Sequence, residues 1–469
     1  MEQMAGRSLQ GFTAVFDQQG EDIDEATRTK TYYLLEVDKE TGKKTIVNRE
    51  RFTIAVINQF GSEMGAHTRG IGDWWDSVTG WFSDAWKAIK DTFNYIFGID
   101  LTNETLDAAK CKQFYDAFDK GLNEIYKQFG KTDYNNWMKQ IYTDKGKNPL
   151  ICDMNIPGSH DSFTSYFKKD TYICHGVDDY VKAQLLTVEE QWSYGVRYFD
   201  VRIANMKGIQ WVHALKCDND QLGIYHTLYC NISAFHALDK ISQLLQKHPG
   251  ETAIVSLQVD GNRTEKILEM SHNLVMGFIN GGMAVRTPRS NMRLSDCAGK
   301  MIIFQSWSPN TKDKDDKVID PDHKYPSGPE MCSGYNEYKN DAKIFFEDQT
   351  VPMHYQNKCA TEKGYYCDQF WKDKKELVLK CFEGIKNESN PLAWAQNQAS
   401  AFVGGALHMK YSKNANVMNP WMTQYVLKHK EDKMGIILSD YVGYDKVFDG
   451  YHCNGTCLPK AVVETNRFR

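Results

Sequence analysis

A histidine followed by an aspartate marks the end of a short apolar run in this chain. His160 and Asp161 come just after the Pro157-Gly158 turn, which interrupts the apolar run 151–156. A Pro-Gly pair ends a strand, and parallel barrels carry their bases and carboxylates at such strand ends. This spacing predicts that His160 and Asp161 belong to a catalytic site.

Four further polar side chains follow the same pattern. Asp200 and Arg202 lie two residues apart in the apolar run 194–203, so both point to one face of a strand. A buried Asp or Arg is costly unless it is paired, and two on one face therefore favour a site. His226 and Asp440 end two later apolar runs.

These side-chain types suit the cleavage of a phosphate diester. Two imidazoles that titrate near neutral pH can act as general base and general acid. A guanidinium beside them binds phosphate through two parallel hydrogen bonds. Carboxylates fix the tautomer of each imidazole and stabilise the imidazolium. The set predicts in-line displacement at phosphorus without a metal or other cofactor.

Isolated histidines are usually structural or exposed. We therefore expect no catalytic role for His175, His213, His236 and His248.

Alternating strands and helices must position the site. Short apolar runs predict strands at 151–156, 196–203, 209–214 with 223–226, 252–258, 301–305, 343–347, 401–406 and 434–440. Apolar residues at three- and four-residue steps predict helices at 188–194, 232–247, 263–279 and 374–387. About eight strands joined mostly by helices predict an α/β fold, a distorted TIM-type (β/α)8 barrel.

The chain divides into three parts on these patterns. Residues 146–450 form the predicted barrel and 451–469 a C-terminal tail, whereas 1–145 read as a mixed region. That region combines β-like runs within 31–60 with amphipathic helices at 73–97 and 106–129. The tryptophan-rich helix 73–97 is either a membrane anchor or a helix packed on the barrel, and the acidic excess on its polar face favours packing.

Composition and charge limit which binding partners are expected. The net charge of −5 and the absence of a basic stripe give no reason to expect nucleic acid binding. No apolar run reaches the ~20 residues that span a bilayer, and residues 1–12 lack the apolar core of a secretory signal. We expect a monomer and leave the compartment open. Cys453 and Cys457 are either a small disulfide loop or two free thiols.

An ordered set of motifs resembles the X region of phosphatidylinositol-specific phospholipase C, in its bacterial, single-barrel form. The motifs are IPGSHDS, Gln191 followed by GVRYFDVRI, IYHTLYC, HPGETAIVSL and LSDCAGKMIIF, and the resemblance extends over roughly residues 146–450. That family acts at a phospholipid membrane surface. The inositol 2-hydroxyl attacks phosphorus and expels diacylglycerol, and water then opens the cyclic phosphate.

The resemblance implies a role for each site residue. It makes His160 the general base and His226 the general acid. The four remaining residues support them: Arg202 stabilises the phosphate, Asp161 assists His226, Asp440 orients His160, and Asp200 ties the arginine and the base in place. Arg202 also stands where the calcium-dependent relatives have a carboxylate, which implies independence from metal.

Departures from the family bear on the head group. Gln258 and Gln305 stand where the family often has basic residues, and Thr350 replaces an aromatic residue after Asp348 in FFEDQT. We expect Gln258, Gln305 and Asp348 to contact substrate. Three readings follow: a phospholipase C acting on inositol lipids, a phosphodiesterase for a glycosylated-inositol or non-inositol substrate, and a catalytically silent lipid-binding module. Retention of both histidines and Arg202 favours an enzyme.

Overall fold

The structure is a computed structural model of the whole chain, and it divides into two units, Met1–Asp73 and Trp74–Arg469. In the first unit, β1 (Leu34–Val37) pairs antiparallel with β2 (Lys44–Asn48), within the predicted β-like region. The described residues are 34–37, 44–48, 89, 93–94, 96–101, 104–168, 181–207, 219–226, 228–260, 264–286, 288–305, 318, 335–337, 343–347, 368–400 and 410–469.

Seven parallel strands form the centre of the second unit, and the predicted α/β class is confirmed. In order across the sheet they are β8 (Met301–Gln305), β7 (Ala253–Val259), β4 (Tyr198–Asn205), β3 (Ile156–Ser159), β12 (Ile436–Ser439), β11 (Trp394–Gln398) and β10 (Lys343–Glu347). Among the described residues no pairing joins β8 to β10, so the barrel is not closed by hydrogen bonds there.

Short antiparallel strands extend this sheet. β5 (Leu222–His226) and β6 (Leu228–Ser233) form a hairpin on β4, and β9 (Tyr335–Glu337) pairs with β10. His226 therefore ends an antiparallel strand, although we expected its strand among the parallel ones. A single residue separates β5 from β6, which explains why these two strands pair as an antiparallel hairpin, since a parallel crossover needs a dozen or more residues.

The first barrel strand lies later in the chain than predicted, and the Pro157-Gly158 pair lies within it rather than ending it. Ile151–Asp153 is a 3-10 turn (η2), and strand pairing starts only at Ile156. The reason lies at Asn155, whose backbone N–H donates to the side chain of Asn466 at 2.9 Å rather than to a neighbouring strand. Another predicted strand, 401–406, lies outside the described residues, whereas β11 precedes it.

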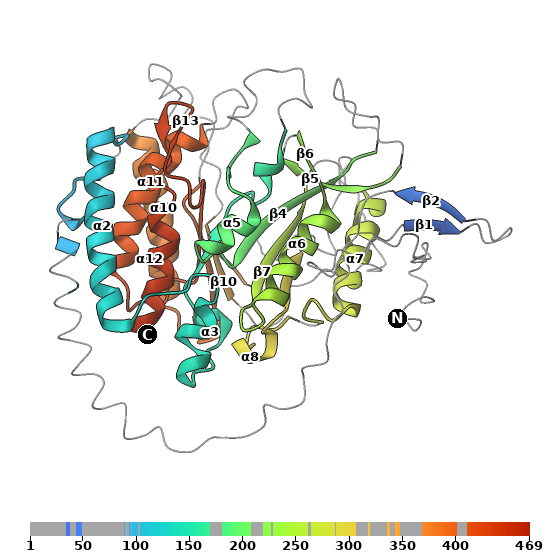
Figure 1. Cartoon of the computed structure of the whole chain (residues 1–469), viewed down its shortest axis with the longest axis horizontal. Helices are drawn as coiled ribbons and strands as arrows, with labels where there is room; N and C mark the ends of the chain where they lie inside the picture. Colours follow the sequence, from blue (N-terminus) through green and yellow to red (C-terminus); the bar gives the residue numbers. More distant parts are fainter. Residues whose placement is uncertain are drawn as a thin grey trace, which may run out of the picture. The chain divides into compact units, whose positions relative to one another are not determined.

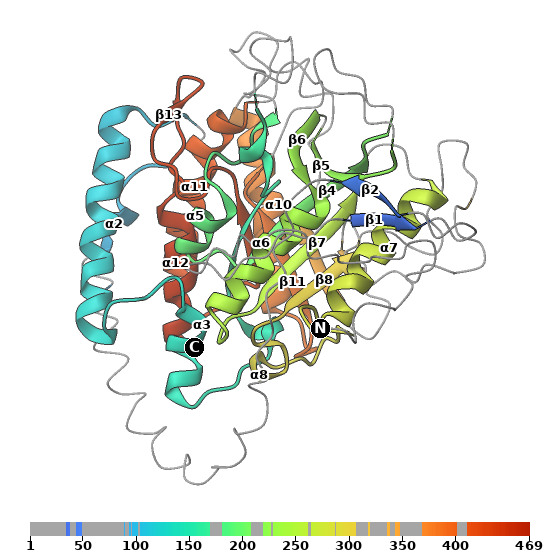
Figure 2. The same cartoon turned by 45° about the vertical axis from the view of Figure 1, so that its right-hand side comes forward.

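Helices cover the outer faces of the sheet (Figures 1 and 2). Five predicted helices are present with shifted ends: α2 (Ala108–Phe129), α5 (Val188–Ser193), α6 (Ala234–Lys247), α7 (Glu265–Asn280) and α10 (Asp368–Lys386). The sequence reasoning missed four others: α3 (Trp137–Ile141), α8 (Leu294–Cys297), α11 (Tyr411–Lys428) and α12 (Cys457–Thr465). In both views α2, α11 and α12 run side by side.

Alternation along each strand separates two buried layers. Tyr198, Ile254 and Leu438 face the barrel interior and pack in one cluster. Phe199, Val255 and their neighbours face outward, under α5, α6 and α7. Because side chains alternate along a strand, Asp200 and Arg202 share the interior face with Tyr198.

The described part of the tryptophan-rich region is buried. Ile89, Phe93 and Ile96 are fully buried, and they belong to a cluster with residues of α2, α10, α11 and α12. This agrees with packing for these positions, while residues 73–88 lie outside the description. The C-terminal α12 packs on β3 and α11. The three-part division of the chain stays a prediction.

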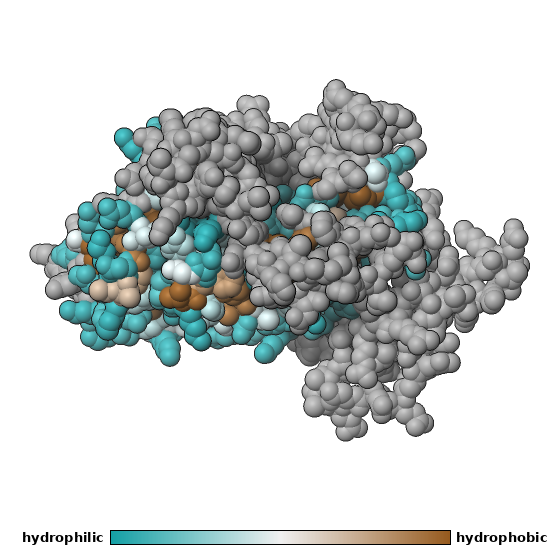
Figure 3. Space-filling view, turned by 90° about the horizontal axis from the view of Figure 1, so that it is seen from above, coloured by the Kyte–Doolittle hydropathy of each residue, from teal (hydrophilic) through white to brown (hydrophobic). Residues whose placement is uncertain are grey.

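Two further observations concern cysteines and membranes. Cys453 and Cys457 are buried free thiols. Within the described ranges no helix is both long and apolar enough to cross a membrane. Seen from above, the coloured residues show separate hydrophobic groups among hydrophilic ones (Figure 3).

Candidate active site

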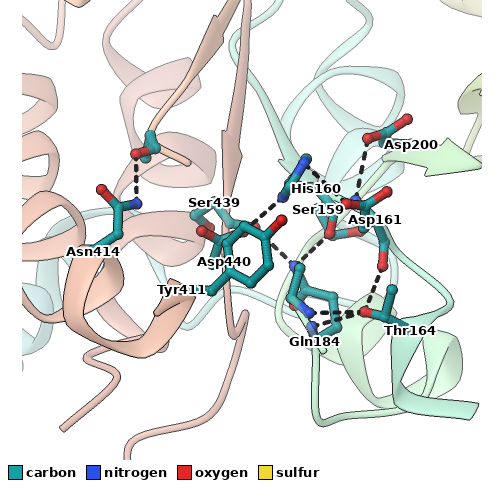
Figure 4. A network of polar contacts seen from close by, with 12 residues as sticks. Ser159, His160, Asp161, Thr164, Gln184, Asp200, Tyr411, Asn414, Ser439 and Asp440 are labelled. Atoms are coloured by element: carbon teal, nitrogen blue, oxygen red, sulfur yellow. Dashed lines mark hydrogen bonds and ion pairs between the residues drawn. The ribbon is translucent and has the colours of Figure 1, made fainter. Parts of the chain in front are cut away.

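His160 lies directly after β3 and is held by Asp440, directly after β12. Its Nδ1 is 2.8 Å from Oδ1 of Asp440, and both side chains are buried (Figure 4). A carboxylate accepts hydrogen bonds, so Nδ1 carries a proton and Nε2 is the nitrogen that is free to exchange one. The two strands are neighbours in the sheet, which explains how residues 280 positions apart meet.

The Nε2 atom of His160 has two neighbours of opposite kind. Nη2 of Arg202 lies 3.0 Å away and Oδ2 of Asp161 lies 3.1 Å away. The guanidinium N–H donates to a neutral ring, whereas the carboxylate accepts from a protonated ring. Each protonation state of His160 therefore has a partner, as a group that takes up and returns a proton requires.

His226 is held in the same manner from the other side. Its Nδ1 lies 2.9 Å from the carbonyl oxygen of Val181, which only accepts, so Nδ1 donates. Its Nε2 lies 3.2 Å from Oδ2 of Asp161. The reactive nitrogens of both histidines thus face one carboxylate oxygen.

Arg202 links the acidic residues of the site. Its Nε lies 2.7 Å from Oδ1 of Asp161, as an ion pair rather than an aligned hydrogen bond, and its Nη2 lies 3.2 Å from Oδ2 of Asp200. Asp200 also accepts from the backbone N–H of Asp161 at 3.2 Å. The side chain of Arg202 is 22% exposed, against 5% for His160, so the guanidinium marks the open side of the cluster.

These charges shift the protonation of the site. Burial by itself lowers the pKa of His160, but the carboxylates of Asp161 and Asp440 outweigh it and raise the pKa to about 9. Burial would raise the pKa of Asp161, yet Arg202, and after it the two histidines, hold this pKa below its ordinary value. With a pKa of about 9, His160 is mostly protonated at neutral pH.

The backbone at both strand ends is tightly constrained. Asp161 and Tyr441 have positive φ angles, 44° and 54°, in the left-handed region that residues other than glycine rarely adopt. The amide of Gln184 donates to the carbonyl oxygens of His160 and Ser439, both at 2.9 Å. It thereby joins the ends of β3 and β12 (Figure 4). Backbone strain of this kind persists where surrounding contacts enforce it.

The six predicted catalytic residues lie close together in the structure. The three residues predicted to contact substrate differ in their position relative to this cluster. Gln258 pairs in register with Arg202 and donates to Oδ1 of Asp200 at 3.0 Å. Gln305 pairs with Leu257, on the face of the sheet that packs against helices, so strand alternation turns it away from the site. Asp348 lies outside the described residues.

Two neighbours of the site were missed by the sequence reasoning. Gln184 lies in a loop, and Tyr411 begins α11, where its ring stands 5.8 Å from that of His160. Gln184 follows no predicted strand, and Tyr411 lies beyond the predicted strand 401–406, in a helix that the sequence reasoning missed.

The cluster also has donors that suit a metal. Ligand atoms of His160, Asp161 and Asp200 lie within 4.8 Å of one another. However, Arg202 already contacts all three of these side chains. A fixed guanidinium supplies the positive charge that a metal would bring, so this donor set does not fit an additional cation well.

Replacing Asp440 with asparagine tests the electrostatics. The Asp440 carboxylate raises the pKa of His160, so its loss lowers that pKa. Neutral His160 is then present at lower pH, and the acid limb of kcat/KM should move to lower pH. The maximal rate should fall by about 10-fold or more, because the ring loses its orienting acceptor.

A pH profile of kcat/KM measures this shift. Asp432→Asn is the matched control, because Asp432 precedes β12 at its opposite end and pairs with Lys386. An acid limb that stays in place, or moves to higher pH, in Asp440→Asn contradicts the assigned role.

Comparison with known proteins bears on this geometry. No family model matches the chain. A PI-PLC X-box domain-containing protein of Dictyostelium discoideum is 28% identical over 204 residues, 40% of this chain and 25% of that protein. A 1-phosphatidylinositol phosphodiesterase of Listeria monocytogenes is 26% identical over 183 residues, 36% of this chain and 52% of that protein.

A solved structure shows the same fold. The phosphatidylinositol-specific phospholipase C of Staphylococcus aureus, in a variant containing pentafluorophenylalanine, matches with a TM-score of 0.50 at 20% identity. The match covers 71% of this chain and 98% of that one. The chain resembles phosphatidylinositol-specific phospholipase C. It therefore has the distorted barrel fold of the phospholipase C, as predicted, and it spans about a quarter to a half of the curated relatives named above.

Proposed function

We propose that this chain is a phosphodiesterase of the phosphatidylinositol-specific phospholipase C type. It would cleave an inositol phospholipid to diacylglycerol and a cyclic inositol phosphate. The name of the Listeria monocytogenes relative, 1-phosphatidylinositol phosphodiesterase, supports this substrate class. The observation that carries the proposal is the convergence of two imidazoles and one guanidinium on Asp161.

The geometry supports a division of labour between the histidines. His160, in its neutral form, takes the proton of the inositol 2-hydroxyl at Nε2 while Asp440 stabilises the resulting imidazolium. His226 gives its Nε2 proton to the oxygen of the departing diacylglycerol. The cyclic phosphate forms as the bond from phosphorus to the glycerol oxygen breaks. For hydrolysis of the cyclic product the two roles reverse.

Arg202 takes the electrostatic part of this reaction. Its guanidinium lies at the open side of the cluster and is held from behind by Asp161 and Asp200. Charge that develops on the phosphate oxygens is best stabilised by a donor fixed in advance. We propose that Arg202 provides this donor, and that no metal is required.

Gln258 bears on which head group is bound rather than on the reaction itself. Its amide is committed to Asp200, which in turn contacts Arg202. An uncharged side chain at this position offers hydrogen bonds but no charge to a polyol. We therefore propose that the head group is an inositol without additional phosphate groups. A lipid with a glycosylated inositol is the second substrate to test.

The test uses purified protein, vesicles and excess EDTA. With phosphatidylinositol vesicles, phosphorus NMR should show a cyclic inositol phosphate, and diacylglycerol should appear in equal amount. Phosphatidylcholine vesicles are the control, because choline has no hydroxyl that can attack phosphorus. Absence of turnover, or turnover restored only by calcium, overturns the proposal. Turnover of glycosylated phosphatidylinositol alone would keep the reaction and change the substrate.

A further inference from the structure

We propose that Tyr411 is a positioning residue for the general acid, with its hydroxyl acting on Nε2 of His226. This inference rests on the proposed function, because it assigns His226 the role of proton donor. Tyr411 is the first residue of α11 and is 2% exposed. Its hydroxyl oxygen lies 3.4 Å from Nε2 of His226.

The tyrosine ring also stands against both histidines. Its centroid lies 5.8 Å from the ring of His160 and 6.0 Å from the ring of His226, tilted to each. Figure 4 shows Tyr411 beside the His160–Asp440 pair, with its hydroxyl directed toward the histidine side of the network. Because Tyr411 is almost fully buried, packing leaves the hydroxyl little freedom to leave the site.

The protonation state of His226 decides what Tyr411 does. Because Nδ1 donates to Val181, a neutral ring has a lone pair at Nε2, and only a donor can pair with it. The Tyr411 hydroxyl is such a donor. A protonated ring instead donates from Nε2 to Asp161, at 3.2 Å. Tyr411 therefore stabilises the neutral form of His226, and Asp161 stabilises the cation.

This preference favours proton transfer to the leaving group. The bond between phosphorus and the glycerol oxygen breaks with its electron pair on oxygen, and that oxygen takes the proton from Nε2. His226 becomes neutral at this step, when Tyr411 gains an acceptor. The hydrogen bond thus strengthens in the direction of reaction, which is the condition for a rate effect.

Other groups near His226 do not duplicate this hydrogen bond. Asp161 is an acceptor, and Arg202 contacts Asp161 rather than His226. Cys230, on β6, contacts the backbone of His226, and burial raises the pKa of its thiol, so it stays neutral. Among the side chains that the structure describes, the hydroxyl at hydrogen-bonding distance from Nε2 of His226 is that of Tyr411.

Packing alone is the competing explanation for Tyr411. The residue belongs to a small buried cluster with Ala415, Tyr441 and Cys453. Packing uses the ring, whereas the proposed role uses the hydroxyl. Tyr411→Phe therefore separates the two, because it keeps the ring and removes only the oxygen.

Two substrates with different leaving groups provide the test. Phosphatidylinositol expels a poor leaving group that needs a general acid, whereas the 4-nitrophenyl ester of inositol phosphate expels a good one that does not. Tyr411→Phe should lower kcat about tenfold on phosphatidylinositol, from the loss of one hydrogen bond. On the aryl ester, kcat should change less than about twofold. Equal losses on both substrates, or no loss on either, overturn the proposal.

Nitrogen-15 NMR of the histidine rings supplies a readout without substrate. At alkaline pH the Nε2 resonance of neutral His226 should move downfield in Tyr411→Phe, because a hydrogen bond to the lone pair is lost. An unmoved resonance overturns the proposal. Tyr142→Phe is the control, since it removes a buried hydroxyl bonded to Asn466 at 2.7 Å instead of to a histidine. If the wild-type protein cleaves neither substrate, the proposed function fails, and the resonance alone decides the placement of the hydroxyl.

Discussion

Replacement of His160 with alanine is expected to lower kcat on phosphatidylinositol by about 10²–10⁴-fold, the usual contribution of a general base. The reason is geometric. Asp440 fixes the Nδ1 proton of His160, and Nε2 faces the arginine that would bind the phosphate. Among the described residues, His160 is the side chain that pairs with the Asp440 carboxylate, so no other described base shares this orientation.

His226→Ala should lower kcat by a similar factor, since the two imidazoles face the same oxygen of Asp161. The double variant should be little worse than either single one, because residues that act as a unit are not additive. His236→Ala is the control, as His236 pairs with Ser233 at the start of α6. Wild-type turnover by a folded His160→Ala protein, shown to be folded by circular dichroism, would remove His160 from the mechanism.

The candidate catalytic residues could be predicted to lie together because most of them follow parallel strands. His160, Arg202 and Asp440 each come from, or directly after, a buried parallel strand, and parallel strands end at the same edge of a barrel. The positions of these residues along the sequence therefore indicated that they lie at the same edge of the barrel. The prediction needed the order and spacing of the strands, and errors of several residues at their ends, as at β3, did no harm.

The differences between the predicted and observed arrangements also have physical causes. Gln305 was expected to contact substrate, but its register with Leu257 turns it toward the helices. A shift of one residue in register reverses the face of a side chain, and sequence alone rarely fixes it. His226 reaches the site from an antiparallel hairpin. Its position next to Asp161 therefore could not be predicted from the rule that parallel strands end at one edge of a barrel.

Contacts made from loops and helix ends were beyond the sequence pattern. Gln184 joins β3 and β12 through two carbonyl oxygens, and Tyr411 approaches the histidines from the first residue of α11. Neither has a periodic signature, because each is placed by the packing of a whole element. Amino-acid type alone did not distinguish Tyr411 from the 24 other tyrosines of the chain, which contains 25.

The second large prediction concerns a buried ion pair outside the candidate active site. Arg197 precedes β4 and Glu251 precedes β7, and both side chains are fully buried, with Nη2 and Oε2 2.8 Å apart. The guanidinium also donates to the carbonyl oxygens of Trp192, Val196, Tyr134 and Asn135, and it lies 3.6 Å above the ring of Trp192. Glu251 in turn accepts from the backbone N–H groups of Met138 and Lys139.

Glu251→Ala is therefore expected to reduce the free energy of unfolding by about 3–5 kcal/mol, the range for removing one partner of a buried pair. The loss leaves the Arg197 charge uncompensated and two backbone donors of α3 without their acceptor. Burial already lowers the pKa of Arg197 to about 10, which shows how strongly this position disfavours charge. Glu251→Gln should cost less, because the amide oxygen still accepts from α3.

Urea unfolding of the variants measures the difference, and an exposed pair provides the control. Glu269 lies 3.5 Å from Lys266 on α7 with both side chains partly exposed, so Glu269→Ala should change the free energy of unfolding by less than about 0.5 kcal/mol. If Glu251→Ala costs no more than Glu269→Ala, the pair does not stabilise the barrel. A large loss in Glu251→Ala together with unchanged kcat in the folded fraction would distinguish this structural pair from Arg202, which contacts Asp161 and Asp200 instead.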